Sequence, residues 1–213
     1  MYLHPGQLHH LYNRGNNGEQ VFYTPAHYQY FLRKVRAHLL PTGRLLAYCL
    51  MPNHFHLLFE PAETDLLGEQ ANRGLGLVLA SYAQGLNQER RRTGSLFQKR
   101  TKAKPLEADP HGRYPLTCLH YLHQNPLRVR LVARLADWPY SSYRDYAGLR
   151  HGTLCALDYG RQLLDLPRPG LYNRISPADT RRVGRALAIL TVPRRPRRSG
   201  GLPAFSSRQP ARC

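Results

Sequence analysis

The sequence predicts an α+β fold in which helices pack on a central antiparallel sheet. Short apolar runs typical of strands alternate with longer segments of helical periodicity, and turn residues separate them. The chain has 213 residues with 42% hydrophobic content, which is enough for one domain with a proper core. Its centre is the predicted hairpin Leu45 to Phe59, in which two apolar arms meet at the turn Met51-Pro52-Asn53.

The first half of the chain supplies a strand, a helix and this hairpin. The first strand should cover Leu8 to Asn13 and end in turn-rich residues. A helix should begin near Thr24, a candidate N-cap followed by Pro25 at the first helical position, and Pro41 to Gly43 should end it. Both arms of the hairpin that follows are nearly continuously apolar, as expected for strands in the middle of a sheet.

The second half supplies two more helices and a last strand. Asp65 is a candidate cap for a helix that runs to about Arg91, although glycines in its middle weaken this prediction. Residues 95–100 are expected to form a basic strand. A third helix should have Pro115 near its start and should be stopped by Pro126.

This order predicts a ferredoxin-like split β-α-β sandwich, with one helix added after the last strand. We expect the helices of the sandwich on one face of the sheet, and the two hairpin arms beside the first and last strands. Residues 1–150 should form the folded domain and residues 151–192 a C-terminal extension. Residues 193–213 have too few apolar side chains for a core and are predicted to be a basic, disordered tail.

Two histidines stand in the second arm of the hairpin. Alternate side chains of a strand share a face, so His54 and His56 should point one way, and Phe55, Leu57 and Phe59 the other. Two imidazoles side by side on a rigid strand make half of a metal site. In a chain with 11 histidines, a pair of half-exposed histidines on a hairpin would give the same pattern. Taken alone, the pattern leaves both interpretations open.

Charge indicates the class of partner. Lys+Arg of 31 against Asp+Glu of 13 gives +18, which favours a polyanion, with nucleic acid ahead of an anionic membrane. Residues 89–104 carry seven basic residues and one acid, and the tail from Arg181 to Arg212 carries nine arginines and no acid. One such run is usually a solvated face, but two favour phosphate contact. The predicted contacts to the DNA backbone are Arg14, Arg90, Arg91, Arg92, Lys99, Arg100, Lys102, Lys104, Arg194, Arg195, Arg197 and Arg198.

The third predicted helix offers a phenol and an amide on one face. Tyr121 and Asn125 are four residues apart. Gln124 is a second candidate amide, although helical spacing favours Asn125. If this helix crosses the sheet near the histidines, nitrogen and oxygen ligands with open positions would suit Mg²⁺ or Mn²⁺. A tyrosine oxygen beside such a cation could attack a phosphodiester and form a phosphotyrosine. Among 14 tyrosines, Tyr121 taken alone would more often be a packing residue.

Several motifs follow one another within the first 145 or so residues: YNRGNN, YCLMPNHFHLLF, RTGSLFQKR, YLHQNPLRVRLV and WPYSSYRDYAG. In this order they resemble the segments of the single-tyrosine HUH transposases (His, hydrophobic, His), the IS200-like family. The Tyr-x-x-x-Asn form and the arginine-rich extension are most similar to the REP-associated tyrosine transposases. The resemblance implies the HUH nuclease fold.

The resemblance also implies roles for individual residues. His54, His56 and Asn125 would be ligands of a divalent metal, Mg²⁺ or Mn²⁺, and Tyr121 the catalytic nucleophile. The implied activity is that of a metal-dependent endonuclease and strand transferase. It would cleave single-stranded DNA near a hairpin, a REP-like palindrome, and leave a 5′-phosphotyrosine and a free 3′-OH.

The same residues allow alternative functions and predict the protein's location and the state of its thiols, but not its oligomeric state. The alternative function is a hairpin-DNA-binding regulatory protein, derived from a transposase, that no longer cuts. An RNA-binding protein on the same sheet would need an aromatic strand pattern that is missing here. Without an apolar run of membrane-spanning length or a signal pattern, we expect a cytoplasmic bacterial protein associated with the nucleoid through DNA. The four scattered cysteines predict reduced thiols. A monomer and a homodimer both stay open.

Overall fold

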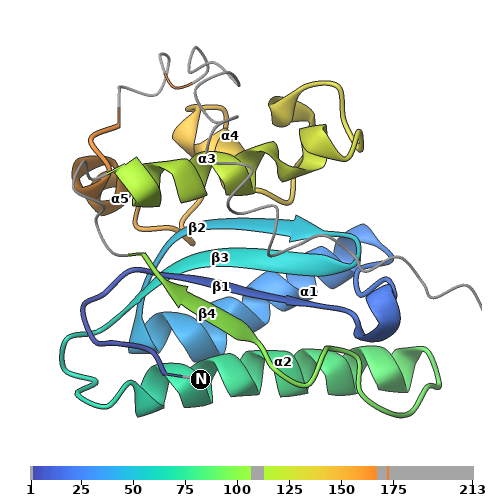
Figure 1. The fold of residues 1–213 in the computed structure, drawn as a ribbon. Helices are drawn as coiled ribbons and strands as arrows, with labels where there is room; N and C mark the ends of the chain where they lie inside the picture. The colour runs from blue at the N-terminus through green and yellow to red at the C-terminus, as the bar shows by residue number, and fades with distance from the viewer. Residues whose placement is uncertain (1, 107–112, 167–171, 173–213) are drawn as a thin grey trace, which may run out of the picture.

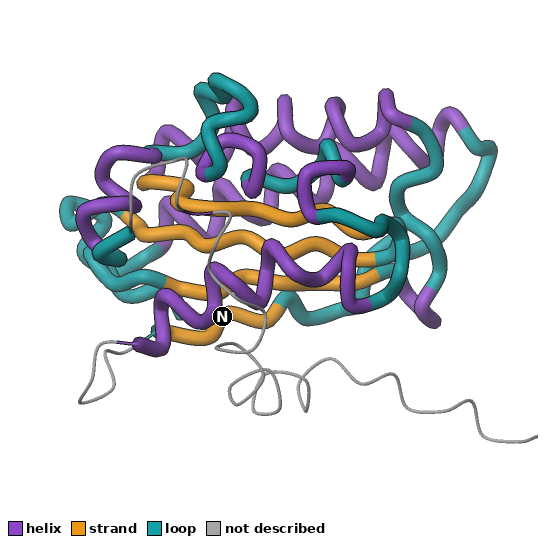
Figure 2. Tube along the Cα trace, turned by 90° about the horizontal axis from the view of Figure 1, so that it is seen from above, coloured by secondary structure: helices purple, strands orange, loops and turns teal. Residues whose placement is uncertain are grey.

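The computed structural model describes residues 2–106, 113–166 and 172, and it arranges them in three layers (Figure 1). A four-stranded sheet lies between two α-helices on one side and three on the other. The long helices run roughly along the strand direction (Figure 2). The elements are β1 (His9–Arg14), η1 (Asn16–Gly18), α1 (Pro25–Lys34), η2 (Val35–Leu39), η3 (Leu40–Thr42), β2 (Gly43–Met51), β3 (His54–Pro61), α2 (Glu69–Glu89), β4 (Lys102–Pro105), α3 (Arg113–Arg128), η4 (Leu135–Asp137), α4 (Tyr143–Tyr146) and α5 (Leu157–Leu163).

The sheet is antiparallel, with the strand order β2-β3-β1-β4. This arrangement confirms the predicted α+β class with a central antiparallel sheet. The prediction that both hairpin arms lie beside the first and last strands is wrong in part: β3 pairs with β1, but β2 lies at an edge. Residues 140–142 cover that edge, because Leu50 N donates to Tyr140 O and Ser142 N donates to Tyr48 O, both at 2.9 Å. The edge strand can therefore be as apolar as a central one.

One face of the sheet packs on α1 and α2. Phe31 of α1, Phe55 and Phe59 of β3, and Tyr82 of α2 are all buried in this layer. Gly74, which weakened the helix prediction, lies where α2 crosses η2. A Cβ at this position would stand only 2.4 Å from the carbonyl oxygen of His38, so the close approach of the two helices requires glycine.

The other face carries α3, α4 and α5. Leu46 and Leu58 of the sheet pack there with Leu119 and Leu122 of α3 and with Tyr146 of α4. We predicted helices on one face of the sheet and a further helix after the last strand. The structure has α1 and α2 on one face, and the added helix, α3, covers the other (Figure 1). Two apolar faces explain why both hairpin arms are almost continuously buried.

The last strand differs from its predicted position. Residues 95–100 do not form it; β4 occupies Lys102–Pro105 and pairs with β1. Leu96 and Phe97 are consecutive and both buried, whereas a half-buried strand would turn one of them outward. This segment instead makes an isolated bridge between Phe97 and Gly15 and then enters the sheet.

Helix ends also depart from the pattern. Thr24 is the N-cap residue of α1, but its side chain makes no capping hydrogen bond. Asp65 does cap α2, from four residues before its start: its carboxylate accepts hydrogen bonds from the amides of Gln70 at 3.2 Å and Ala71 at 2.9 Å. Pro126 does not stop α3, which continues to Arg128 because proline at this position removes only one ladder donor near the helix end.

The described part of the extension packs on the domain. Ala156 N donates to Leu45 O at 2.9 Å, and Tyr172 is buried against the helices above the sheet. The boundaries at residues 150 and 192 stay predictions, and the basic tail lies outside the described residues. Within the described residues, the cysteines are free, and no helix has the length and apolar character of a membrane span.

Candidate active site

A cleft of about 880 Å³ opens between the turn that joins β2 to β3, the end of β1 and the C-terminal half of α3. It contains the two histidines of β3 together with the predicted tyrosine and amide of α3. The residues that line it are Tyr12, Asn13, Arg14, Gly18, Gln20, Met51, Pro52, Asn53, His54, Phe55, His56, Gln98, Arg100, Lys102, Tyr121, Asn125, Val129 and Leu131. The fold therefore joins residues that are far apart in the sequence.

The histidines share a face of β3, as strand alternation predicts. Their ring centroids are 5.0 Å apart and the rings are nearly perpendicular, while Phe55 points into the opposite core. Nδ1 of His54 and Oδ1 of Asn53 are 2.7 Å apart, and the Asn53 amide nitrogen donates to Gly18 O at 3.3 Å. Since an amide oxygen only accepts, His54 donates from Nδ1 and its Nε2 keeps a lone pair.

Burial keeps both imidazoles neutral. Desolvation, helped by the positive charge of Arg14, lowers the pKa of His54 to about 4. Desolvation also lowers the pKa of His56 well below its ordinary value, with smaller effects from His54 and His10. A neutral imidazole is the form that binds metals, so these shifts suit a ligand pair.

Tyr121 and Asn125 reach the same cleft from α3. The Tyr121 ring is edge-on to His56, with centroids 5.8 Å apart, and the guanidinium of Arg128 lies 5.5 Å from its centroid. Of the two adjacent amides, Asn125 lines the cleft, and Gln124 is not among the lining residues. Asn125, the amide that helical spacing favours, therefore lies at the same cleft as the histidines, and its role as a ligand stays a prediction.

These residues fit a divalent cation. Two buried side-chain atoms here have no hydrogen-bond partner within the described chain. They are Nε2 of His56 and the amide nitrogen of Asn125. Turning the Asn125 amide over would put its oxygen where the unpartnered nitrogen stands. The described residues hold no cluster of three His, Cys, Asp or Glu side chains that could hold a metal ion. An amide oxygen suits Mg²⁺ and Mn²⁺, so Asn125 is a candidate third ligand beside the histidine pair.

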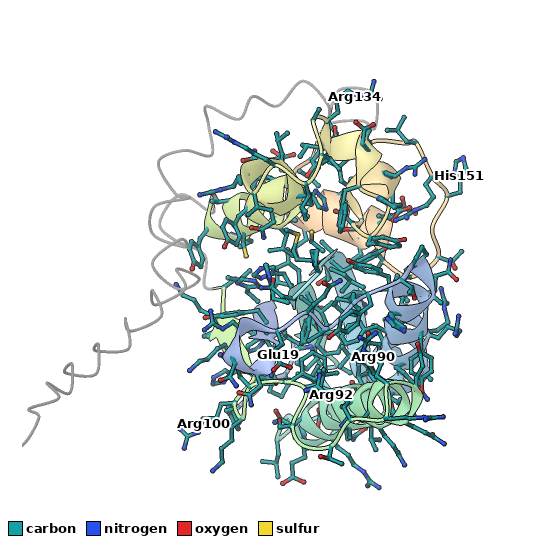
Figure 3. The ribbon with its side chains drawn as sticks, turned by 90° about the vertical axis from the view of Figure 1, so that its right-hand side faces the viewer. Glu19, Arg90, Arg92, Arg100, Arg134 and His151 are labelled. Atoms are coloured by element: carbon teal, nitrogen blue, oxygen red, sulfur yellow. The ribbon has the colours of Figure 1, made fainter. Side chains whose placement is uncertain are left out.

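The described residues among the predicted DNA contacts fall into three groups: those that line the cleft, those with a partner on the protein, and those exposed elsewhere. Arg14, Arg100 and Lys102 line the cleft, and Arg100 points outward at its edge of the molecule (Figure 3). Three others have protein partners: Arg90 lies 3.8 Å over the Tyr23 ring, Arg92 pairs with Glu19 at 3.0 Å, and Lys104 lies 4.8 Å over Tyr114. Arg91 and Lys99 are exposed, and Arg194, Arg195, Arg197 and Arg198 lie outside the described residues.

Comparison with known proteins gives two informative matches. A protein of Haemophilus influenzae, provisionally named a REP-associated tyrosine transposase, is 27% identical over 106 residues, which are 46% of this chain. The chain spans little more than half (57%) of that relative's length. A solved structure of a REP-associated tyrosine transposase bound to a REP hairpin superposes with a TM-score of 0.54 and 15% identity, covering 73% of this chain and 93% of that one. No protein-family model matches the chain.

The resemblance to the REP-associated tyrosine transposases is confirmed. The fold match extends over most of the solved transposase, so the sandwich with its added helix is a fold that a REP-associated tyrosine transposase also adopts. At 15% identity this match supports the fold alone, and the roles of the cleft residues remain predictions.

Sequence reasoning missed three residues around the cleft. His10 shares a hydrogen bond with His56, Tyr12 lines the cleft with its ring 4.8 Å from that of His10, and Arg128 lies over Tyr121. His10 lies outside the motifs that resemble the REP-associated tyrosine transposases, and only the pairing of β1 with β3 brings it to His56. Arg128 could have been found, because it is seven residues from Tyr121 and so lies on the same face of α3.

Proposed function

We propose that this protein cleaves and rejoins single-stranded DNA beside a hairpin, with Tyr121 as the nucleophile. One observation carries the proposal: His54, His56, Tyr121 and Asn125, drawn from two elements, line a single cleft with basic side chains at its edge. The similarity to REP-associated tyrosine transposases, one of which is solved with a REP hairpin, supports the choice of substrate.

The chemistry assigned to the chain is a transesterification. The Tyr121 oxygen attacks phosphorus in line and loses its proton, a new P–O bond forms, and the bond to the 3′ oxygen breaks. The 3′ oxygen takes up a proton and leaves as a free 3′-OH, so the DNA remains joined to the protein through a 5′-phosphotyrosine. Attack by another 3′-OH reverses these bonds and transfers the strand.

His54, His56 and Asn125 would hold the divalent cation, Mg²⁺ or Mn²⁺. When bound, the cation would polarise a non-bridging phosphate oxygen and stabilise charge in the transition state. The protein's own contribution is to place the phosphate: Arg14, in the cleft lining, and Arg128, over the nucleophile, supply positive charge beside it.

A denaturing gel tests the proposal. Wild type is incubated with single-stranded hairpin oligonucleotides from repeated palindromes, with Mn²⁺ or with EDTA. We expect a slow-migrating, metal-dependent adduct that is absent in Tyr121→Phe and retained in Tyr114→Phe, a matched change on the same helix. Loss of cleavage in His56→Ala would support the ligand assignment.

Two outcomes would count against it. An adduct that persists in Tyr121→Phe would refute the assigned nucleophile. Tight hairpin binding without cleavage under either Mg²⁺ or Mn²⁺ would favour the alternative, a hairpin-binding regulator that no longer cuts.

A further inference from the structure

His10 is a buried histidine of β1 that contacts the cleft histidine His56. In the β1–β3 ladder Tyr12 lies opposite His56 and His10 opposite Leu58, so His10 is a diagonal neighbour of His56 on the face that α3 covers. Nε2 of His10 and Nδ1 of His56 are 2.8 Å apart in a buried hydrogen bond. The two rings stack with centroids 5.0 Å apart.

The proton in this bond has two possible positions. If His56 donates from Nδ1, its Nε2 carries a lone pair. If His10 donates from Nε2, a neutral His56 carries its hydrogen on Nε2 instead. Only the first arrangement lets the His56 Nε2 bind a cation beside the Nε2 of His54. Nε2 of His56 is buried without a hydrogen-bond partner within the described chain, and so is Nδ1 of His10, which would carry the His10 hydrogen in the first arrangement.

We propose that His10 is a positioning residue for the metal site: its Nε2 accepts the Nδ1 proton of His56 and so holds the His56 Nε2 lone pair available for the cation. This inference rests on the proposed function, because it requires a cation bound by His54, His56 and Asn125. Histidine ligands usually donate their second nitrogen to a carboxylate, a carbonyl or water. Here a neutral imidazole takes that place.

The neighbouring ligand shows the same arrangement with a different partner. Nδ1 of His54 donates to Oδ1 of Asn53 at 2.7 Å, and Asn53 comes from the turn just before β3. Each histidine of the pair thus has one outer partner at Nδ1. For His54 the proton position follows from the amide oxygen, whereas for His56 it depends on His10 acting as the acceptor.

Titration calorimetry with MnCl₂ on the full-length protein tests this role. His10→Phe keeps a ring of similar size but removes the acceptor, and should weaken Mn²⁺ binding by about 10- to 100-fold. His10→Gln restores an acceptor at similar reach and should recover most of the affinity. His9→Gln is the matched control, because His9 is a buried histidine of the same strand that faces away from His56 and bonds Gln7 O. Melting curves in EDTA show whether each variant is folded.

The outcomes separate the two proposals. If His10→Phe binds Mn²⁺ as wild type does, or if His10→Gln and His10→Phe lose equal affinity, the role of His10 is refuted while the metal site stands. If wild type binds no Mn²⁺, with or without a hairpin oligonucleotide, the metal site of the proposed function and the role of His10 fall together.

A second measurement needs no variant. Long-range ¹H–¹⁵N spectra of the imidazoles in metal-free wild type, in EDTA, should show His56 protonated at Nδ1, a tautomer that no bound cation then imposes. Protonation at Nε2 would refute the proposal.

Discussion

At the scale of single residues, burial determines which histidines stay neutral. His123 on α3 is 2% exposed, and its Nδ1 and Nε2 bond Tyr172 Oη at 2.8 Å and Ser142 Oγ at 2.9 Å. Burial lowers the pKa of His123 well below its ordinary value, with a smaller contribution from His120. The folded state therefore resists protonation at a position that ties the extension to α3.

This shift predicts a loss of stability in mild acid. The unfolded chain takes up a proton on His123 below pH 6.5, while the folded chain does not, so the free energy of unfolding falls as pH falls. The contribution of one such histidine is up to about 1.4 kcal/mol per pH unit below 6.5. In urea titrations with EDTA, wild type should lose more stability between pH 7 and pH 5 than His123→Gln does.

The control for this measurement is His151→Gln, because His151 is exposed at the edge of the molecule (Figure 3). It should show the same loss as wild type. An equal loss in wild type and His123→Gln would show that His123 does not titrate between the two states in this way.

At the scale of elements, periodicity predicted what lies on one strand or one helix. Strand alternation predicted that His56 and Phe55 lie on opposite faces of β3. Helical spacing predicted that Tyr121 and Asn125 share one face of α3. Periodicity could not predict contacts between elements. His10 and His56 are 46 positions apart and meet only through the β1–β3 register. The last strand was likewise predicted at the wrong residues. Leu96 and Phe97 are consecutive and both buried, and a local pattern does not show which sides of a segment the core will cover.

Two of the glycines of α2, Gly74 and Gly76, give an element-scale prediction. Gly74→Ala would bring a Cβ to 2.4 Å from the His38 carbonyl and should destabilise the protein by about 1–3 kcal/mol. Gly76 faces open space, so Gly76→Ala should stabilise it by up to about 1 kcal/mol through helix propensity. Urea unfolding of both variants measures the pair. Equal effects would contradict the close packing of α2 on η2.

At the scale of the whole molecule, net charge gives the partner class but not the place of contact. The chain carries +18, yet several predicted DNA contacts are bound to protein groups. Arg100 and Lys102 at the cleft are exposed, and Arg134, which pairs with Asp137 at 2.8 Å, lies at the opposite end of the molecule (Figure 3). Composition alone could not separate these groups, because it does not show which arginines find partners on folding.

Salt dependence distinguishes them. For binding to a hairpin oligonucleotide, Arg100→Ala should reduce the slope of log K against log salt by about 0.7 for a contact to single-stranded DNA, or about 0.9 for a contact to the duplex. Arg134→Ala should leave the slope unchanged. Fluorescence anisotropy at several salt concentrations gives both slopes. A larger change in Arg134→Ala than in Arg100→Ala would place the DNA on the other side of the molecule.

Mass-spectrometric mapping of the covalent adduct tests the central claim most directly. Wild type reacted with a hairpin oligonucleotide and Mn²⁺ would be digested with nuclease and protease, and the peptide that carries a 5′-phosphonucleotide would be sequenced. Our account predicts the modification on Tyr121, in the peptide of α3. A nucleotide on Tyr12, the other tyrosine that lines the cleft, or cleavage without any protein-linked nucleotide, would contradict it.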